Sequence, residues 1–209
     1  MKKETTPFLI FTAIILTFII FIYDSQIIQS IQLTHNIYLD YIFLSIAFAS
    51  NIFIIFFFLT SLFLWKEHKR RWILPLWTSG IISLAMSKIL KIIIKRPRPF
   101  QQESIGIFGT VLYFMKDNFY TWNFSFPSFQ AMFVFSSIPI LNKEFPKLKY
   151  FWFPLACLVA FSRVYFGAHY LSDIFSGAII GYLIGLAIIK LEEKYKPSQN
   201  ILKKLKIKK

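Results

Sequence analysis

Residues 161–173 read FSRVYFGAHYLSD and lie between two apolar runs of a chain that is 56% hydrophobic. Arg163, His169 and Asp173 therefore occur where the flanking sequence is suited to lipid. Ionisable side chains near lipid are costly and commonly mark a functional site. His169 and Asp173 are four residues apart, so they share one face if a helix begins there. A carboxylate that is hydrogen-bonded to one imidazole nitrogen fixes the tautomer and leaves the other nitrogen free as a nucleophile or base.

The composition of the whole chain indicates a multi-pass membrane protein. Of its 209 residues, 20% are aromatic and only 16% are charged, which is too apolar for an ordinary soluble domain. The length suits a single domain over residues 1–209. The net charge of +14 does not favour a nucleic-acid binder, because the basic residues cluster between apolar runs. The basic tail, 192–209, is expected to lie in the cytoplasm near anionic headgroups.

Six apolar segments approach the ~20 residues that a membrane-spanning helix needs. The sequence therefore predicts an all-α, six-transmembrane helix bundle, with spans near 7–23, 41–65, 72–94, 127–141, 150–166 and 173–191. Lysine and arginine flank the ends predicted to be inside, so both termini are expected in the cytoplasm. The connections 24–40, 95–126 and 166–172 then face outward. The aromatic stretch 119–126 is expected to form an interfacial belt or a lid.

A basic cluster, KIIIKRPRP (91–99), closes the third predicted span. Lys95, Arg96 and Arg98 lie on the side predicted to face outward, contrary to the positive-inside rule, and an anionic ligand would explain them. Lys91 and Arg98 are seven residues apart, which would place them on one helix face. The alternative is that these side chains reach for the interface at a helix end.

A third polar cluster, FPSFQ (126–130), opens the fourth predicted span. Pro127 suits a first helical turn, where Ser128 and the free N–H groups can face an anion. A capped helix start is the alternative. The predicted topology brings all three clusters to the same membrane face. Cationic side chains there suit the oxygens of a phosphate, and His169 suits attack on phosphorus.

Two of these clusters match long-spaced motifs in full. The first reads Lys91-x6-Arg98-Pro99, and the other reads Ser162-Arg163-x5-His169-x3-Asp173. On these motifs the chain resembles the type-2 phosphatidic acid phosphatase superfamily, membrane lipid phosphatases related to vanadium haloperoxidases. The motif core covers about residues 88–185. The family patterns are K-x6-RP, PSGH and SR-x5-H-x3-D.

The resemblance implies a role for each matched residue. His169 would be the nucleophile that forms a phosphohistidine, and Asp173 would orient it. Lys91, Arg98 and Arg163 would bind the phosphoryl oxygens. The phosphate cradle would be completed by Ser128 and the backbone N–H of Phe129. The family needs no metal, and the sequence shows no outer cluster of carboxylates or histidines that would hold one; no cofactor is expected.

The second motif departs from the family pattern, because Phe129 and Gln130 stand where the family has glycine and histidine. The family histidine resembles a general acid, and general acid catalysis is typically worth about 10²–10⁴-fold. Three interpretations follow. The protein binds lipid phosphates with little or no catalysis, it acts on a substrate with a good leaving group, or another residue such as His35 supplies the acid.

The function predicted from these residues is a metal-independent membrane phosphatase acting on a lipid phosphate or pyrophosphate. Candidate substrates are a polyprenyl pyrophosphate such as undecaprenyl pyrophosphate, a lipid A phosphate, phosphatidylglycerol phosphate and phosphatidic acid. A lipid phosphotransferase and a non-catalytic binder are the alternatives. The expected location is a bacterial cytoplasmic (inner) membrane, with the active site facing the periplasm.

Expected partners are the substrate and membrane lipids, with no nucleic acid and no obligatory protein partner. Three small residues on the last span are expected to pack within the bundle: Gly177, Gly181 and Gly185.

Overall fold

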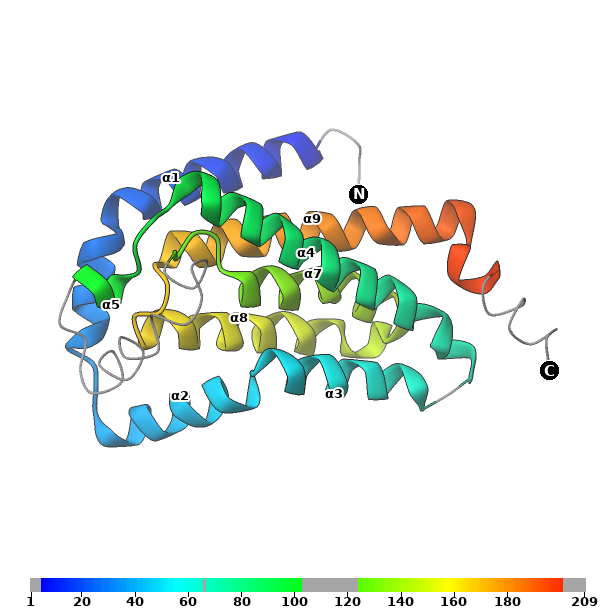
Figure 1. Cartoon of the computed structure of the whole chain (residues 1–209), viewed down its shortest axis with the longest axis horizontal. Helices are drawn as coiled ribbons and strands as arrows, with labels where there is room; N and C mark the ends of the chain where they lie inside the picture. The colour runs from blue at the N-terminus through cyan, green and yellow to red at the C-terminus, as the bar shows by residue number, and fades with distance from the viewer. Residues whose placement is uncertain (1–4, 66, 103–123, 201–209) are drawn as a thin grey trace.

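The computed structural model describes residues 5–65, 67–102 and 124–200, and these ranges are helical apart from short connections and one isolated bridge between Pro97 and Phe124. Most of the helices run along the long axis of the molecule (Figure 1). The predicted all-α fold is thereby confirmed for the described residues. The elements are α1 (Thr5–Gln32), α2 (Ile37–Ala49), α3 (Ile52–Leu64), η1 (Glu67–Trp72), α4 (Ile73–Ile94), α5 (Pro99–Gln102), α7 (Phe129–Glu144), η4 (Pro146–Leu148), α8 (Lys149–Tyr165) and α9 (Leu171–Tyr195).

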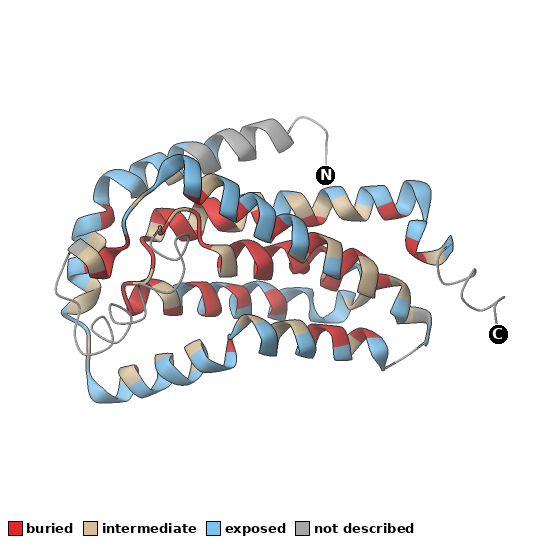
Figure 2. Cartoon of the chain, in the orientation of Figure 1, coloured by how far each residue is buried: buried red, intermediate tan, exposed pale blue. Residues whose placement is uncertain are grey.

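Helix α7 forms the centre of the bundle. Every residue from Ala131 to Leu141 is buried, and Figure 2 shows this helix largely red while α1 and α2 are mostly pale blue. A helix that is buried on all sides must be enclosed by neighbours. Helices α4, α8 and α9 enclose α7, so the residues at its two ends are held by several elements at once.

Helices α7 and α9 approach closely along the three glycines of α9. A Cβ added at Gly181 would lie 2.1 Å from the carbonyl oxygen of Met132, and one added at Gly177 would lie 2.6 Å from that of Ser128. Real Cβ atoms do not approach backbone oxygens so closely, so only glycine permits this contact. The prediction that these glycines pack within the bundle is confirmed.

The outer surface of the bundle is apolar. Phe18 on α1, Phe53 on α3 and Ile93 on α4 are 66%, 69% and 69% exposed, and many other large apolar side chains are exposed in the same way. Soluble monomers rarely expose contiguous apolar patches above a few hundred Å². The surface is therefore suited to lipid.

Three helices contain stretches that are long and apolar enough to cross a membrane: Ile15–Gln32, Lys69–Ile94 and Leu171–Tyr195. Helices α2 and α3 meet this criterion only as a pair, with a 61° bend between them. Helices α7 and α8 have 16 and 17 residues, just under one bilayer crossing. The structure thus supports three or four spans among the described residues, and six spans remains a prediction.

The second predicted span, 41–65, is wrong as a continuous helix. It breaks between α2 and α3, where the side chain of Asn51 accepts a hydrogen bond from the backbone N–H of Phe53 at 3.0 Å and begins a new helix. Asparagine is a preferred residue at such a helix start. The break places Ser50 in the interior of the bundle, where it is 2% exposed.

Two connections also differ from expectation. The predicted loop 24–40 is mostly helical, because α1 continues to Gln32 and α2 begins at Ile37. Helix α4 ends at Ile94, so Arg98 does not share a helix face with Lys91. Of the predicted outer segment 95–126, residues 103–123 lie outside the described ranges, as does most of the aromatic stretch 119–126.

Candidate functional site

The motif residues lie at one end of the bundle. There α4 ends, α7 begins, α8 ends and α9 begins, and the α5 segment follows α4 at the same end (Figure 1). Residues 91–98, 128–130 and 163–173 all lie at or beside these helix ends. The site is therefore built on helix ends that the buried α7 holds in place.

His169 and Asp173 form a buried pair. His169 precedes α9, and Asp173 lies in its first turn. The Nδ1 atom of His169 is 3.7 Å from Oδ2 of Asp173, and the two residues are 5% and 0% exposed. Oδ2 also accepts a hydrogen bond from the backbone N–H of Tyr170 at 2.9 Å. The contact with His169 is longer than a hydrogen bond.

Arg98 contacts the other nitrogen of His169. Its Nη1 atom lies 3.3 Å from Nε2 of His169 and donates to the carbonyl oxygen of Ala168 at 2.7 Å. A guanidinium group only donates, so Nε2 must accept. The neutral ring therefore carries its proton on Nδ1, facing Asp173, and its lone pair on Nε2.

Burial and the charge of Arg98 lower the pKa of His169 to about 3, against the opposing effect of Asp173. The imidazole is therefore neutral near pH 7 and keeps its lone pair. Burial is also the main cause that lowers the pKa of Arg98 to about 10, so the guanidinium remains charged at that pH. A neutral imidazole beside a fixed cation suits an anionic ligand.

Lys91 holds the polypeptide that leads into α7. Its Nζ atom donates to the carbonyl oxygen of Phe124 and to that of Ser125, the latter at 3.3 Å. The side chain is 6% exposed. An ammonium group has three donors, and these two bonds aim Lys91 at the connection before α7.

Arg163 is bound to the break between α2 and α3. Its Nη2 atom donates to Oγ of Ser50 at 2.7 Å and to the carbonyl oxygen of Ala47 at 3.1 Å. Its Nε–H is buried and has no hydrogen-bond acceptor among the described residues. The Nη2 atom of this guanidinium therefore joins α8 to the break between α2 and α3. Its buried Nε–H is left without an acceptor among the described residues.

The three residues of the second motif have separate roles in the fold. Ser128 is the N-cap of α7, where its Oγ accepts from the backbone N–H of Ala131 at 3.4 Å, and its own N–H donates to the carbonyl oxygen of Asp173 at 3.1 Å. The ring of Phe129 packs against that of Phe133. Gln130 donates from Nε2 to the carbonyl oxygen of Ser50 at 3.1 Å. The helix begins at Phe129 rather than at the predicted position 127.

His35 has contacts that do not suit it as the substitute acid. Its Nδ1 lies 2.9 Å from Oδ1 of Asp40, and its Nε2 lies 3.0 Å from the carbonyl oxygen of Tyr165. The imidazole also stacks on the Tyr165 ring, with 4.1 Å between centroids. Both nitrogens are thus engaged in tying the α1–α2 connection to the end of α8.

Sequence reasoning missed Asp24, and it assigned Arg96 to an anionic ligand rather than to carboxylates of the protein. Arg96 donates from Nη1 to Oδ1 of Asp173 at 2.8 Å and from Nη2 to Oδ2 of Asp24 at 2.8 Å. Both residues carried a signal: Arg96 violated the positive-inside rule, and Asp24 is an acid beside a long apolar run. The pairing itself required the fold.

Among the described residues, no three side chains of histidine, cysteine, aspartate or glutamate come together as a metal site. The expectation that the protein works without a metal remains a prediction.

Comparison with known proteins decides the family. Residues 72–197, more than half of the chain, match the family model of the PAP2 superfamily. This chain belongs to the PAP2 superfamily. The matched segment contains every predicted site residue from Lys91 to Asp173, which confirms the resemblance drawn from the motifs. No curated protein sequence matches the chain.

Two solved structures have the PAP2 fold seen here. A transmembrane PAP2-type phosphatidylglycerolphosphate phosphatase from Bacillus subtilis is 22% identical, with a TM-score of 0.67 over 94% of this chain and 99% of that one. LpxE from Aquifex aeolicus is 24% identical, with a TM-score of 0.61 over 80% of this chain and 94% of that one. At such identities the likeness establishes the fold.

Proposed function

We propose that this protein is a membrane phosphatase that hydrolyses a lipid phosphate or pyrophosphate through a phosphohistidine on His169. The observation that carries the proposal is the neutral, buried imidazole whose Nε2 faces the guanidinium of Arg98 at 3.3 Å. Membership of the PAP2 superfamily supports it. The Bacillus subtilis structure, described as a phosphatidylglycerolphosphate phosphatase, supports a lipid phosphate as the class of substrate.

The reaction begins when the Nε2 lone pair of His169 attacks phosphorus. The P–N bond forms as the P–O bond to the leaving group breaks, and the departing oxygen takes the bonding electron pair and, where it needs one, a proton from solvent. The ring becomes positively charged, and Asp173 stabilises that charge through the Nδ1–H. Water then attacks phosphorus and loses a proton to solvent as the P–N bond breaks, which restores the Nε2 lone pair and releases inorganic phosphate.

Cationic side chains bind the phosphoryl oxygens during both steps. Arg98 already lies against Nε2, so a phosphate at that nitrogen would meet its N–H groups. Arg163 has a buried Nε–H without an acceptor among the described residues, and a phosphate oxygen would satisfy it. Lys91 adds a donor on the α4 side. Fixed cations of this kind stabilise charge that develops in the transition state.

Gln130 favours a substrate whose leaving group needs little protonation. An amide N–H donates a hydrogen bond but does not release a proton near neutral pH, and this one is already bonded to Ser50. A phosphoanhydride releases a phosphate, which leaves without a strong acid. We therefore rank a polyprenyl pyrophosphate or an anomeric lipid A phosphate above phosphatidylglycerol phosphate and phosphatidic acid.

An apolar cavity supports a lipid rather than a soluble phosphate. It has a volume of about 360 Å³ and lies between the α2–α3 pair and helices α7 and α8. Ile54, Phe58 and Val159 are among its walls, and Ser50 lies on its lining. Because Ser50 also contacts Arg163, the cavity adjoins one of the cationic side chains proposed to bind phosphate. A hydrocarbon chain in it would leave the phosphate beside His169.

The membrane arrangement belongs to the same proposal. Six spans require that α7 and α8 cross the bilayer with the help of adjoining residues. Both termini then lie in the cytoplasm, and the site opens to the periplasmic side of a bacterial inner membrane. The basic residues that follow the second and fourth predicted spans support this orientation.

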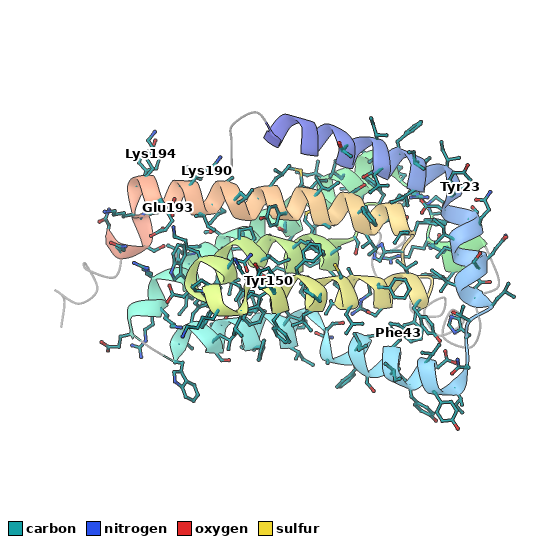
Figure 3. The ribbon with its side chains drawn as sticks, turned by 180° about the vertical axis from the view of Figure 1, so that it is seen from behind. Tyr23, Phe43, Tyr150, Lys190, Glu193 and Lys194 are labelled. Carbon is teal, nitrogen blue, oxygen red and sulfur yellow. The ribbon has the colours of Figure 1, made fainter. Side chains whose placement is uncertain are left out.

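The direct test measures phosphate release from a panel of lipid phosphates by purified wild-type protein and by His169→Ala. The panel contains undecaprenyl pyrophosphate, lipid A phosphate, phosphatidylglycerol phosphate and phosphatidic acid. Lys190→Gln is the matched control, because Lys190 lies at the end of the bundle opposite Tyr23 and the site (Figure 3). Release by wild type and the control, but not by His169→Ala, supports the proposal.

The same assay separates the alternatives. If wild type and His169→Ala bind the lipids equally and neither releases phosphate, the protein is a non-catalytic binder, which the replacement of the family histidine by Gln130 would then explain. Adding a lipid alcohol tests for transfer. A new phosphorylated lipid formed in place of inorganic phosphate would identify a phosphotransferase.

A further inference from the structure

A row of three charged side chains, two buried and one largely buried, connects α1 to the partner of His169. It runs from Asp24 on α1 through Arg96, which follows α4, to Asp173 on α9. The side chains are 2%, 14% and 0% exposed, and each link between them is 2.8 Å long. We call these three residues the ion-pair chain. Asp24 lies outside residues 72–197, the segment that matches the family model.

Arg96 is held in one orientation from several sides. Its Nη1 atom also donates to Oγ of Ser172 at 2.7 Å, and its Cζ atom lies over two aromatic rings, 3.9 Å from the ring centre of Tyr170 and 4.6 Å from that of Phe21. A planar guanidinium can bridge two carboxylates and stack on aromatic rings at once, whereas a lysine ammonium cannot. A lysine at position 96 could therefore not make the same set of contacts.

Asp24 also fixes the position of Arg96. Its Oδ1 accepts from the backbone N–H of Ser172 at 3.1 Å, and its Oδ2 accepts from the Ser172 hydroxyl as well as from Arg96. These bonds join α1 to the first turn of α9. The carboxylate therefore compensates the buried charge of Arg96 and fixes the start of the helix that carries Asp173.

The two oxygens of Asp173 are used differently. Oδ1 accepts from Arg96, while Oδ2 accepts from Tyr170 N–H and faces Nδ1 of His169. The bond to Arg96 sets the rotation of the carboxylate, and its positive charge reduces how strongly Oδ2 attracts a proton. Both effects reach His169 only through Asp173.

We propose that Arg96 and Asp24 are positioning residues, which orient the Asp173 carboxylate and set how strongly it holds the Nδ1 proton of His169. This inference rests on the proposed function for the role of His169. The geometry of the ion-pair chain does not depend on that function, so the chain can be tested on the imidazole itself.

The sign of each expected effect follows from charge. The charged groups around His169 are Lys91 from α4, Arg98 before α5, Arg163 from α8 and Asp173 from α9, and none of them is altered in the test. Removing the positive charge of Arg96 strengthens the attraction of Asp173 for the imidazole proton. Removing the negative charge of Asp24 weakens that attraction, because Arg96 then pairs with Asp173 only.

The experiment is nitrogen-15 NMR of histidine-labelled protein in detergent micelles as a function of pH. The chain has only three histidines, and loss of a signal in His169→Gln assigns the resonance of His169. Wild type is expected to show the neutral ring protonated on Nδ1. Arg96→Gln is expected to raise the titration midpoint of His169 by on the order of one pH unit. Asp24→Asn is expected to lower it.

Two further variants control for misfolding of Arg96→Gln and for the effect of removing any nearby positive charge. Arg96→Gln leaves two buried carboxylates without their cation and is at risk of misfolding. The double variant Asp24→Asn with Arg96→Gln removes opposite charges together, and it is expected to raise the midpoint by less than Arg96→Gln. Lys95→Gln is the matched control, because it removes an exposed positive charge from the neighbouring residue and is expected to leave the midpoint unmoved.

The proposal is overturned if the folded double variant and any folded Arg96→Gln protein keep the wild-type midpoint, or if Asp24→Asn does not lower it. If the wild-type protein releases no phosphate from any lipid but the midpoints move as expected, the proposed function fails and the positioning role stands. If the protein is active, Arg96→Lys should lower kcat about tenfold with little change in KM.

Discussion

Replacing Gly181 with alanine is expected to force α7 and α9 apart. The new Cβ would lie 2.1 Å from the carbonyl oxygen of Met132 and 2.8 Å from the Cα and carbonyl carbon of that residue. All three atoms belong to the backbone of the buried central helix, so no side-chain rotation relieves the clash. Ordinary contact requires a separation that is larger by roughly 1 Å, in an interior packed as densely as a crystal.

The expected cost lies at the upper end of the range for overpacking, about 3 kcal/mol. For a chain of this length that loss corresponds to a fall in Tm on the order of 10 °C. Activity should fall as well. The N–H of Ser128, at the start of α7, donates to the carbonyl oxygen of Asp173 at 3.1 Å, so separating the helices also disturbs the site.

The measurement is thermal unfolding of the purified protein in detergent, with phosphate release measured on the same samples. Gly80→Ala is the matched control, since its Cβ meets a side chain, the ring edge of Phe133 at 2.7 Å, rather than the backbone of α7. It should cost less than half as much. Equal Tm values for Gly181→Ala, Gly80→Ala and wild type would refute the reasoning that the contact between α7 and α9 requires glycine.

Three further predictions concern the site, each with its own measurement. The pKa of His169 is about 3 in the folded protein against an ordinary value of 6.5. As pH falls from 6.5 towards 3, His169 therefore binds a proton in the unfolded chain but not in the folded protein. Stability should drop by about 1.4 kcal/mol per pH unit in that window, and denaturation of His169→Gln should show a shallower pH dependence. Gln130→His should raise kcat/KM for a monoester more than for an anhydride; an equal or negative change for both would mean that Gln130 serves mainly to hold Ser50. Arg98→Lys keeps the charge but loses the planar fork, and kcat/KM should fall on the order of 10²-fold; unchanged kinetics would show that Arg98 does not contact the phosphate.

The sequence was sufficient to predict the helical fold and the residues that gather at its end. Those predictions depended on long apolar runs and on spacings such as the six residues between Lys91 and Arg98. Helix periodicity was a poorer guide. Arg98 does not reach His169 from the face of α4 but through the extended connection after Ile94, and His169 lies just before the helix that holds Asp173.

The partners of these motif residues were harder to predict, because each lies far away in the chain. Asp24 pairs with Arg96 across 72 residues, and no local pattern links an acid in α1 to a cation after α4. The pairing follows from burial, since neither charge is tolerated alone in an apolar interior. Sequence reasoning identified the unusual charge of Arg96 but assigned it to the ligand rather than to a second carboxylate.

The break between α2 and α3 has a similar cause. In a continuous helix, the carbonyl oxygens of Ala47 and Ser50 would accept hydrogen bonds from N–H groups four residues later. Ending α2 leaves such carbonyls without their helical N–H partners at the negative end of the helix dipole, and Arg163 bonds to both, at 3.1 and 3.5 Å. Gln130 bonds to the carbonyl oxygen of Ser50 as well. Asn51 supplies the cap that allows the break, and Arg163 on α8, 113 residues from Ser50 in sequence, binds the groups that the break exposes. An apolar run that reads as one span is therefore divided where the site needs acceptors, and a hydropathy pattern carries no information about that need.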